Sequence, residues 1–415
     1  MTESQGPRKA ALAFVFVTVA LDMLALGMII PVLPSLILDF TGGDEAHAAA
    51  MTGLFGTLWA AMQFLASPVL GALSDTLGRR RIILISNFGL GLDYLLMALA
   101  PNMTWLFVGR VLSGITAASI STSFAYIADI TAPEKRAQSF GMLGAAFGLG
   151  FVIGPALGGV LGALGPRVPF WAACTLSLLN GCYGLFVLPE SLPKDKRAPF
   201  SFARANPLGS LLFLRSKTGV LGLSFLAFLS NTAHHVLPAT FVLYAMHRYG
   251  WGTRDVGLML GAVGVSSSVV QAVLVRRVVP MFGERRTLIA AYGFGALGFS
   301  LYGFAPVGWM LVLAIPVTAL WGLAGPAGQA LMSKRVEATE QGQLQGVQSS
   351  LQGISGMVGP FIFASVFAHF ISGPPESQIP GAAFYLAGLM LACNAVFAVL
   401  ATRDFKSAPV QPTPA

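Results

Sequence analysis

The stretch from Gly71 to Arg81, GALSDTLGRRR, joins two long apolar segments, residues 47–74 and 82–100. A helix needs about 20 apolar residues to cross the roughly 30 Å core of a bilayer, and both segments reach about that length. Glycines permit a tight turn, and adjacent arginines are costly inside a membrane. We therefore predict that this stretch is a short loop between two membrane-spanning helices.

The composition of the whole chain agrees with a membrane protein. Of its 415 residues, 55% are hydrophobic and only 10% are charged, and the mean hydropathy is +0.73. Soluble domains carry about 25% charged residues, and a single soluble core stops growing near about 250–300 residues. These values argue against a soluble enzyme, a disordered regulator and a nucleic-acid binder, despite the net charge of +8.

Apolar segments long enough to span a bilayer occur twelve times. They are continuously apolar rather than alternating, which favours helices over a β-barrel. We expect an all-α membrane protein with helices at residues 10–38, 47–74, 82–100, 103–127, 138–163, 168–188, 217–245, 256–280, 287–305, 307–333, 343–371 and 381–402.

The longest polar stretch divides these helices into two groups of six. We therefore predict an N-terminal bundle at residues 1–188, a cytoplasmic linker at residues 189–216 and a C-terminal bundle at residues 217–415. Of the 25 Lys and Arg residues, 21 fall on the side of the termini and the linker. Because cytoplasmic loops are rich in Lys and Arg, this side is predicted to be cytoplasmic, in a bacterial inner membrane.

The second half of the chain repeats the first. Glycines recur at an offset of 205 residues, and Val32-Leu33-Pro34 recurs as Val236-Leu237-Pro238 at an offset of 204. Because six is an even number, the two copies have the same orientation in the membrane. Parallel six-helix repeats with a substrate site between them are typical of transporters. The glycine pairs are Gly78 with Gly283, Gly141 with Gly346, Gly148 with Gly353, and Gly154 with Gly359.

The loop quoted above resembles the signature loop of the major facilitator superfamily. In this interpretation Gly71 lets neighbouring helices approach, and Gly78 permits the turn. Asp75 either caps a helix or pairs with an arginine such as Arg79 at the cytoplasmic gate. Arg80, and Asp129 at the end of the fourth helix, are further gating candidates. Pro280 replaces the acid in the second copy of the loop, which predicts two unequal gates.

Two further motifs resemble motifs of the same family. Leu106, Arg110 and Gly114 in the fourth helix match a motif linked to proton coupling, so Arg110 needs a buried partner. Alternatively, Arg110 reaches the outer surface near Trp105. The glycine-rich face of the fifth helix is similar to a motif of antiporters and allows close helix packing, with Pro155 allowing a bend. That face consists of Gly141, Gly150, Gly154, Pro155, Gly158 and Gly159.

A narrower resemblance is to tetracycline/proton antiporters. Leu21-Asp22 with Pro31 to Pro34, Leu92 to Leu96, and Gly109 to Thr116 carry it. Two positions depart from that pattern: Gly295 stands where those antiporters carry an aspartate, and Ser267 where they carry a histidine. The identity of the substrate is left open by these departures.

Buried ionisable residues are the candidates for proton exchange. Asp22 and Asp93 lie inside apolar segments of the first half, and the second half offers His234 and His235. Carboxylates in a low-dielectric environment tend to bind protons, and histidine titrates near neutral pH. In the alternative interpretation, the Asp93-Tyr94 pair only forms structural hydrogen bonds with a neighbouring helix, and the histidines are structural as well.

Polar and aromatic residues within the helices are the candidates for substrate binding. We name Trp59, Gln63, Asn231, His235, Gln271, Trp321 and Gln329. The chain has no Walker-type phosphate-binding motif, and nothing in it suggests a metal site, a cofactor or a nucleic-acid partner.

We expect a monomeric, non-enzymatic antiporter that exports an amphipathic, drug-like organic compound in exchange for protons, surrounded by membrane lipid. A proton-linked uptake carrier for a small metabolite or organic anion, and a non-transporting receptor or scaffold, remain alternatives.

Overall fold

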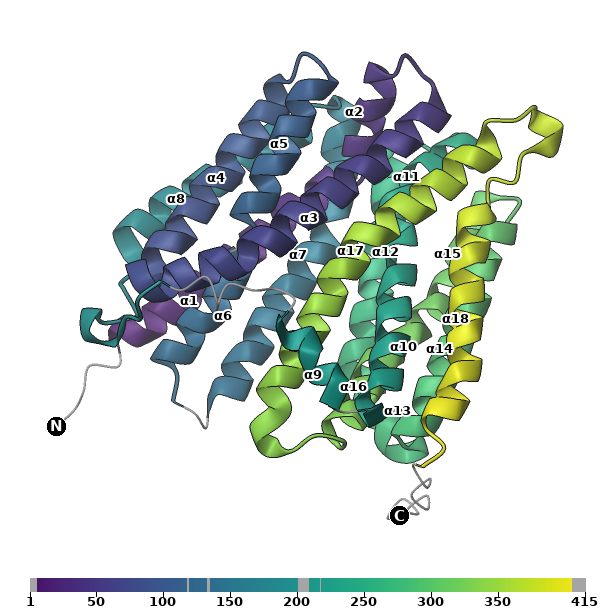
Figure 1. The fold of residues 1–415 in the computed structure, drawn as a ribbon. Helices are drawn as coiled ribbons and strands as arrows, with labels where there is room; N and C mark the ends of the chain where they lie inside the picture. Colours follow the sequence, from purple (N-terminus) through teal and green to yellow (C-terminus); the bar gives the residue numbers. More distant parts are fainter. Residues whose placement is uncertain (1–5, 118, 133–134, 201–208, 217, 405–415) are drawn as a thin grey trace. The chain divides into compact units, whose positions relative to one another are not determined.

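The computed structural model describes residues 6–117, 119–132, 135–200, 209–216 and 218–404, and within these ranges the chain forms helices and no strands (Figure 1). Twelve helical spans in the described part are long and apolar enough to cross a membrane, which confirms the predicted number. The first six are formed by α1 (Gly6–Ile29), α2 (Leu33–Phe40), α3 (Glu45–Leu77), α4 (Arg79–Leu99), α5 (Met103–Thr116), α6 (Ser119–Ile130), α7 (Arg136–Leu164) and α8 (Val168–Val187).

The other six spans follow a short helix, α9 (Phe213–Ser216). They are formed by α10 (Thr218–His234), α11 (Val236–Tyr249), α12 (Thr253–Val269), α13 (Val275–Phe282), α14 (Glu284–Phe304), α15 (Gly308–Ala319), α16 (Ala324–Ser333), α17 (Gln341–Ile371) and α18 (Ala382–Ala401).

Several spans that the sequence predicts as single helices are interrupted. The first span turns at residues 30–32 between α1 and α2, and the seventh turns at His235 between α10 and α11. Pro34 and Pro238 lie just after these turns, and proline cannot donate the backbone hydrogen bond that a continuous helix needs. The repeated Val-Leu-Pro sequence therefore marks the same helix break in both halves.

The chain divides into two compact units. Unit 1 comprises Met1–Gly42, Leu58–Pro207 and Gly252–Gly261, and unit 2 comprises Gly43–Thr57, Leu208–Trp251 and Ala262–Ala415. The first turns of α3 thus belong to unit 2, and the first half of α12 belongs to unit 1.

Unit 1 is built around α1 and α4. Helix α1 packs against α7 and α8, and α4 packs against α5, α6 and α8. Its core is apolar and includes the buried side chains of Phe14, Val19, Tyr126 and Leu143. These contacts hold the ends of α3, α4, α6 and α8 near one another, where the signature loop lies.

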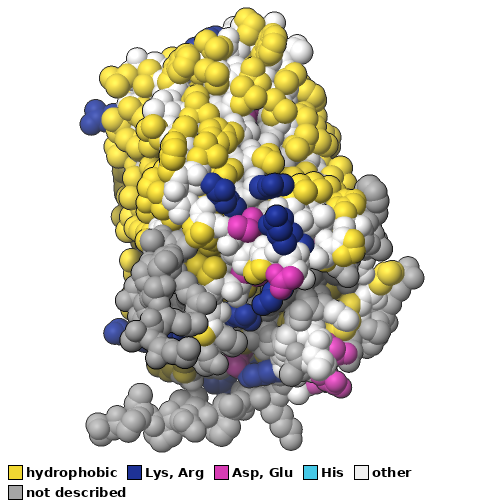
Figure 2. Space-filling view, turned by 90° about the vertical axis from the view of Figure 1, so that its left-hand side faces the viewer, with side chains coloured by type: hydrophobic (Ala, Val, Ile, Leu, Met, Phe, Trp, Pro, Cys, Tyr) yellow, Lys and Arg dark blue, Asp and Glu magenta, His cyan; other side chains and the backbone are white. Residues whose placement is uncertain are grey.

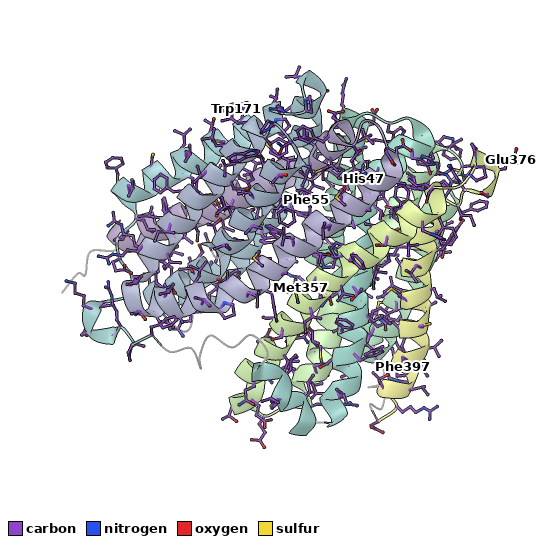
Figure 3. All side chains as sticks on the ribbon, turned by 45° about the horizontal axis from the view of Figure 1, so that its top comes forward. His47, Phe55, Trp171, Met357, Glu376 and Phe397 are labelled. Atoms are coloured by element: carbon purple, nitrogen blue, oxygen red, sulfur yellow. The ribbon has the colours of Figure 1, made fainter. Side chains whose placement is uncertain are left out.

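Unit 2 is built around α14, which packs against α15, α16 and α18, while α10 packs against α17 and α18. Its core is aromatic: Tyr244, Phe299, Tyr302 and Phe384 are fully buried, and the Tyr244 and Phe384 ring centroids are 4.8 Å apart. The start of α3 joins this unit, because the Thr57 hydroxyl donates a 2.8 Å hydrogen bond to the carbonyl of Met357 on α17. Figure 3 labels Phe55 on this part of α3 and Met357 on α17.

Large apolar side chains are exposed on the helices of both units. Phe186 is 89% exposed, and Leu313 and Val396 are 66% exposed. On the face shown in Figure 2, hydrophobic side chains dominate the upper part, whereas Lys, Arg, Asp and Glu gather lower down. An apolar exterior of this kind is stable against lipid tails rather than water.

Candidate functional site

The signature loop is the turn between α3 and α4. Gly78 has φ +104°, a backbone conformation that favours glycine, and it lets α4 begin one residue later at Arg79. A Cβ at Gly78 would collide with the carboxylate of Glu190, which follows α8. The tight turn therefore also makes room for an acid from a distant part of unit 1.

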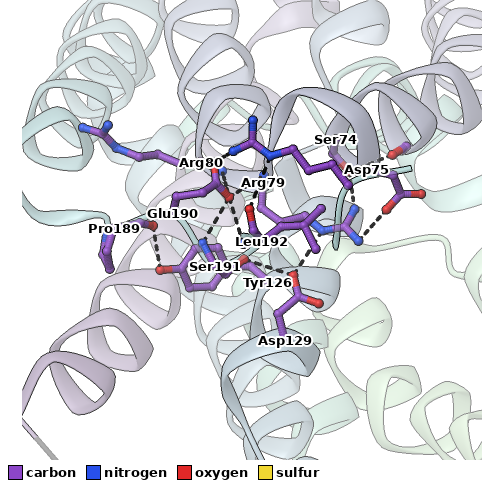
Figure 4. Close-up of polar contacts among 12 residues, drawn as sticks. Ser74, Asp75, Arg79, Arg80, Tyr126, Asp129, Pro189, Glu190, Ser191 and Leu192 are labelled. Carbon is purple, nitrogen blue, oxygen red and sulfur yellow. Dashed lines mark hydrogen bonds and ion pairs between the residues drawn. The ribbon is translucent and has the colours of Figure 1, made fainter. Parts of the chain in front are cut away.

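Glu190 caps the first turn of α4, a role that the sequence analysis missed. Its Oε1 accepts hydrogen bonds from the backbone N–H of Arg79 at 2.9 Å and of Leu192 at 3.1 Å (Figure 4). Its Oε2 lies 3.7 Å from the Arg197 guanidinium. Neither Gly78 nor its neighbours supply a side-chain cap for α4, and an acid near the positive end of a helix dipole is stabilised. The sequence signal that could have indicated such a cap is the start of α4 at Gly78, which has no side chain to cap the helix.

Arg79 is at the centre of a polar cluster that consists of Asp75, Asp129, Glu190 and Ser191 around its side chain and backbone. Its guanidinium lies 2.5 Å from Asp75 on α3 and 3.3 Å from Asp129 on α6, and the Ser191 hydroxyl donates to Asp129 at 3.0 Å (Figure 4). Of the two roles predicted for Asp75, the structure contains the arginine pair, and Glu190 does the capping. The cluster thus ties the ends of α3, α4 and α6 to the segment after α8.

Two other loop residues differ in what they contact. Arg80 donates a 2.6 Å hydrogen bond to the carbonyl of Leu185 on α8. A Cβ at Gly71 would meet no described atom within 4 Å. The prediction that Gly71 allows close helix approach therefore stays a prediction.

The second half carries a counterpart of the cluster with its charges exchanged. At the offset of 205 residues, Arg79 corresponds to Glu284 and Asp129 corresponds to Lys334. Lys334 Nζ lies 2.6 Å from Glu284 Oε1, so the same two helix ends are paired in unit 2 by the opposite charges. Gly283 takes φ +78°, like Gly78, but a Cβ there would meet no described atom within 4 Å.

The predicted proton-coupling residues of the first half lie together in unit 1. Asp22 on α1, Asp93 on α4 and Arg110 on α5 are 3%, 0% and 7% exposed, and they are the only charged side chains that are buried in the described part of the chain. The charges of Asp93 and Arg110 interact, and the Tyr94 phenol is within electrostatic reach of both carboxylates.

Arg110 is buried rather than directed to the surface. Its guanidinium carbon lies 5.5 Å from the centroid of the Trp59 ring on α3, a cation–π distance. Trp105, in contrast, is 47% exposed. Of the two interpretations of Arg110 from the sequence, the structure matches the one with buried partners. Gln63 lies one turn after Trp59, and both pack their backbones against Gly114.

The glycine face of α7 lies against α1. A Cβ at Gly154 would be 2.7 Å from the Cα of Gly27, and one at Gly158 would collide with the Met28 backbone. Gly159 packs in the same way against Gly257 of α12. Gly150 also lies against α1, whereas a Cβ at Gly141 would meet no described atom within 4 Å, so close packing within the described residues involves the later part of the motif. Pro155 lies inside the unbroken helix.

The candidate residues of the second half surround an aromatic group in unit 2. The Trp321 indole N–H donates a 3.1 Å hydrogen bond to Ser230, and its ring lies 5.6 Å from His234. A Cβ at Gly295 would lie 2.6 Å from Leu391 Cδ1 and 2.9 Å from the Trp321 ring, so a side chain at that position would have to displace its neighbours. Trp321 thus occupies the space that an acid would need.

The remaining candidates have different surroundings. His235 packs its Cβ against Gly359 at the break between α10 and α11, and its ring centroid is 6.2 Å from that of His234. Gln271 donates a 3.3 Å hydrogen bond to the Gly322 carbonyl. Asn231 and Gln329 line a common cavity. The acids and the histidines belong to different units, and no group of residues that could hold a metal is found in the described ranges.

Known proteins resemble this chain over most of its length. The sequence matches the family profile of the Major Facilitator Superfamily over residues 15–360 and 282–415. It is 38% identical to the class C tetracycline resistance protein of Escherichia coli over 91% of this chain and 95% of that protein. It is 33% identical to the class H protein of Pasteurella multocida over 88% of this chain and 90% of that protein.

The crystal structure of a human organic anion transporter has the same fold. It superposes with a TM-score of 0.69 over 95% of this chain and 100% of its own, at 24% sequence identity. The twelve spans, the paired helix breaks and these matches agree with one another. This chain is an integral, multi-pass membrane transporter and not an enzyme, and it belongs to the major facilitator superfamily, close to the tetracycline resistance proteins.

Proposed function

We propose that this protein exports an amphipathic organic compound of the tetracycline type in exchange for protons, by alternating access. The two similar resistance proteins support the substrate class, since both are named for tetracycline. The single observation that supports the proton coupling is the pair of buried carboxylates, Asp22 and Asp93, of which Asp93 is within electrostatic reach of Arg110.

A buried carboxylate suits a cycle that needs one protonated and one empty state. An ionised carboxylate in a low-dielectric environment is unfavourable unless it is compensated, so binding a proton and binding a partner compete. One proton falling through 100 mV releases about 2.3 kcal/mol. That free energy sustains roughly fiftyfold accumulation at about 1.4 kcal/mol per tenfold.

The test uses everted vesicles with an acidic interior. The wild-type protein should accumulate tetracycline and release protons when the drug is added. Asp22→Asn should abolish accumulation but still exchange drug down its own gradient, because exchange needs no net proton step. Asp93→Asn should act in the same way but more mildly, since part of its role is contact with neighbouring helices.

Two variants complete the test. Asp39→Asn is the matched control, because Asp39 is an exposed acid of the same half and should retain accumulation. His235→Ala should shift the pH optimum if the histidine relays protons. Accumulation by both Asp22→Asn and Asp93→Asn with an unchanged pH profile would refute the proposal, as would drug uptake together with protons in right-side-out cells.

A further inference from the structure

A small cavity lies within unit 2, among α10, α14, α16 and α17. Its volume is about 90 Å³, and its polar lining consists of Ser230, Asn231, Tyr292, Gln329 and Gln348. None of the residues that line it is charged. A water molecule occupies about 30 Å³ of liquid, so the cavity holds about three waters or one functional group of a larger molecule.

Three of the five polar side chains are already engaged, and two are available. The Tyr292 phenol is hydrogen-bonded to Ser230. Ser230 accepts the hydrogen bond from Trp321, and Gln348 Nε2 lies 3.0 Å from the sulfur of Met332. The side chains of Asn231 and Gln329 form no hydrogen bond with any other described residue. Each carboxamide offers two donors and one acceptor oxygen to whatever enters the cavity.

The repeat shows what this cavity lacks. Asp22 of the first half corresponds to Leu226 at the offset of 204, and Leu226 lines the cavity. An entering carboxylate or ammonium group would lose its hydration without gaining a counter-charge, which is strongly unfavourable. A neutral group with a donor and an acceptor would instead pair with both amides.

We infer that this cavity binds an uncharged edge of the substrate that carries both a hydrogen-bond donor and an acceptor, such as a primary carboxamide, with Asn231 and Gln329 as the specificity-determining residues. The inference rests on the proposed function and deepens it. The first half would exchange protons, and the second half would recognise the neutral polar edge of the drug.

The experiment compares two probes that differ only at that edge. Tetracycline carries a primary carboxamide, whereas its nitrile analogue keeps the ring system but has no amide donors. Affinities of both are measured on the purified full-length protein in lipid nanodiscs. The wild-type protein should bind tetracycline roughly tenfold more tightly than the nitrile, since each hydrogen bond is worth about 1 kcal/mol.

Gln329→Leu and Asn231→Leu should reduce that preference to about twofold or less, because leucine removes the amide at similar volume. Gln345→Leu removes an exposed amide on α17 outside the cavity and should keep the wild-type preference. The ratio of affinities within one variant is unaffected by a partial loss of folded protein. A preference that persists in both leucine variants would overturn the inference. Failure of the wild-type protein to bind either probe would instead refute the proposed function.

Discussion

The turns at Gly78 and at Gly283 have the same backbone but different connections. Both glycines take a positive φ, and both precede a charged residue that pairs with the end of a neighbouring helix. In unit 1 the arginine at this position contacts two acids, and a third acid, Glu190, caps the helix. In unit 2 one exposed pair, Glu284 with Lys334, stands alone in place of that network.

The difference shows that two copies of a repeat can keep the same backbone turn while one copy has fewer ion pairs and hydrogen bonds around it. An isolated surface pair contributes about 0–1 kcal/mol, whereas charged groups that share several hydrogen bonds contribute more. The same backbone turn therefore gives a firmly connected helix junction in unit 1 and a loosely connected one in unit 2. If the helix junctions at Gly78 and Gly283 open during transport, opening requires more free energy in unit 1 than in unit 2.

Among variants at the two turns, the largest expected effect comes from Glu190→Ala. The change removes the cap of α4 and the partner of Arg197, so the transport rate in everted vesicles should fall about tenfold, the equivalent of about 1.4 kcal/mol. Glu284→Ala removes the ion pair at the turn of unit 2 and should lower the rate by less than about threefold. Equal losses in the two variants would show that the two junctions are equivalent.

The second largest difference is expected between the unfolding midpoints of Gly78→Ala and Gly283→Ala. Both place alanine at a positive φ, which costs about 1 kcal/mol, but only the first also displaces the Glu190 carboxylate. We expect Gly78→Ala to lower the thermal unfolding midpoint by about twice as much as Gly283→Ala, because about 1 kcal/mol corresponds to a few degrees. Equal decreases in the two midpoints would mean that the Glu190 side chain can move away from the new Cβ without loss of stability.

Exchanging the charges of the Glu284–Lys334 and Arg79–Asp129 pairs should change the unfolding midpoint less, but it should separate the two units more clearly. Glu284→Lys should lower the unfolding midpoint by about 1–3 °C, and adding Lys334→Glu should restore it, because neither residue has another ion-pair partner among the described residues. Arg79→Asp with Asp129→Arg should not be restored, since the new aspartate would face Asp75. Recovery in unit 1 would contradict the network described here.

The smallest expected effect is that of Pro280→Asp. The change adds the acid that the second loop lacks at the position of Asp75. Because Glu284 rather than arginine stands four residues later, the new acid meets a like charge across the turn. The arginines one turn earlier on α13, Arg276 and Arg277, are exposed, so a pair with either adds little. The transport rate should stay within about twofold of the wild type. A clear increase in rate would show that the missing acid limits the second junction.

Much of the fold could be predicted from the sequence. The long apolar segments predict the twelve spans, because a bilayer requires apolar surface over a fixed length. The breaks within the first and seventh spans were not predicted, although Pro34 and Pro238 were quoted as part of the repeat. Proline restricts the local backbone, but whether a helix bends or stops there depends on the packing around it.

The site could be predicted only in part. Asp22, Asp93 and Arg110 were found because a charge in an apolar segment is conspicuous, and the structure brings them together in unit 1. Glu190 was missed because an acid in a polar linker looks ordinary, and only the fold places it at the start of α4. The packing role of Gly71 stays a prediction, because helix spacing cannot be inferred from a glycine alone and a Cβ there would meet no described atom within 4 Å.

By itself, the sequence determined which segments enter the membrane and which residues carry charge there, since both follow from the transfer of each residue from water to lipid. Tertiary structure alone decided which distant groups meet: Glu190 with the turn at Gly78, Trp321 with Gly295, and Glu284 with Lys334. Such pairings depend on the angles and offsets at which helices pack, and these are set by many small contacts rather than by any local pattern.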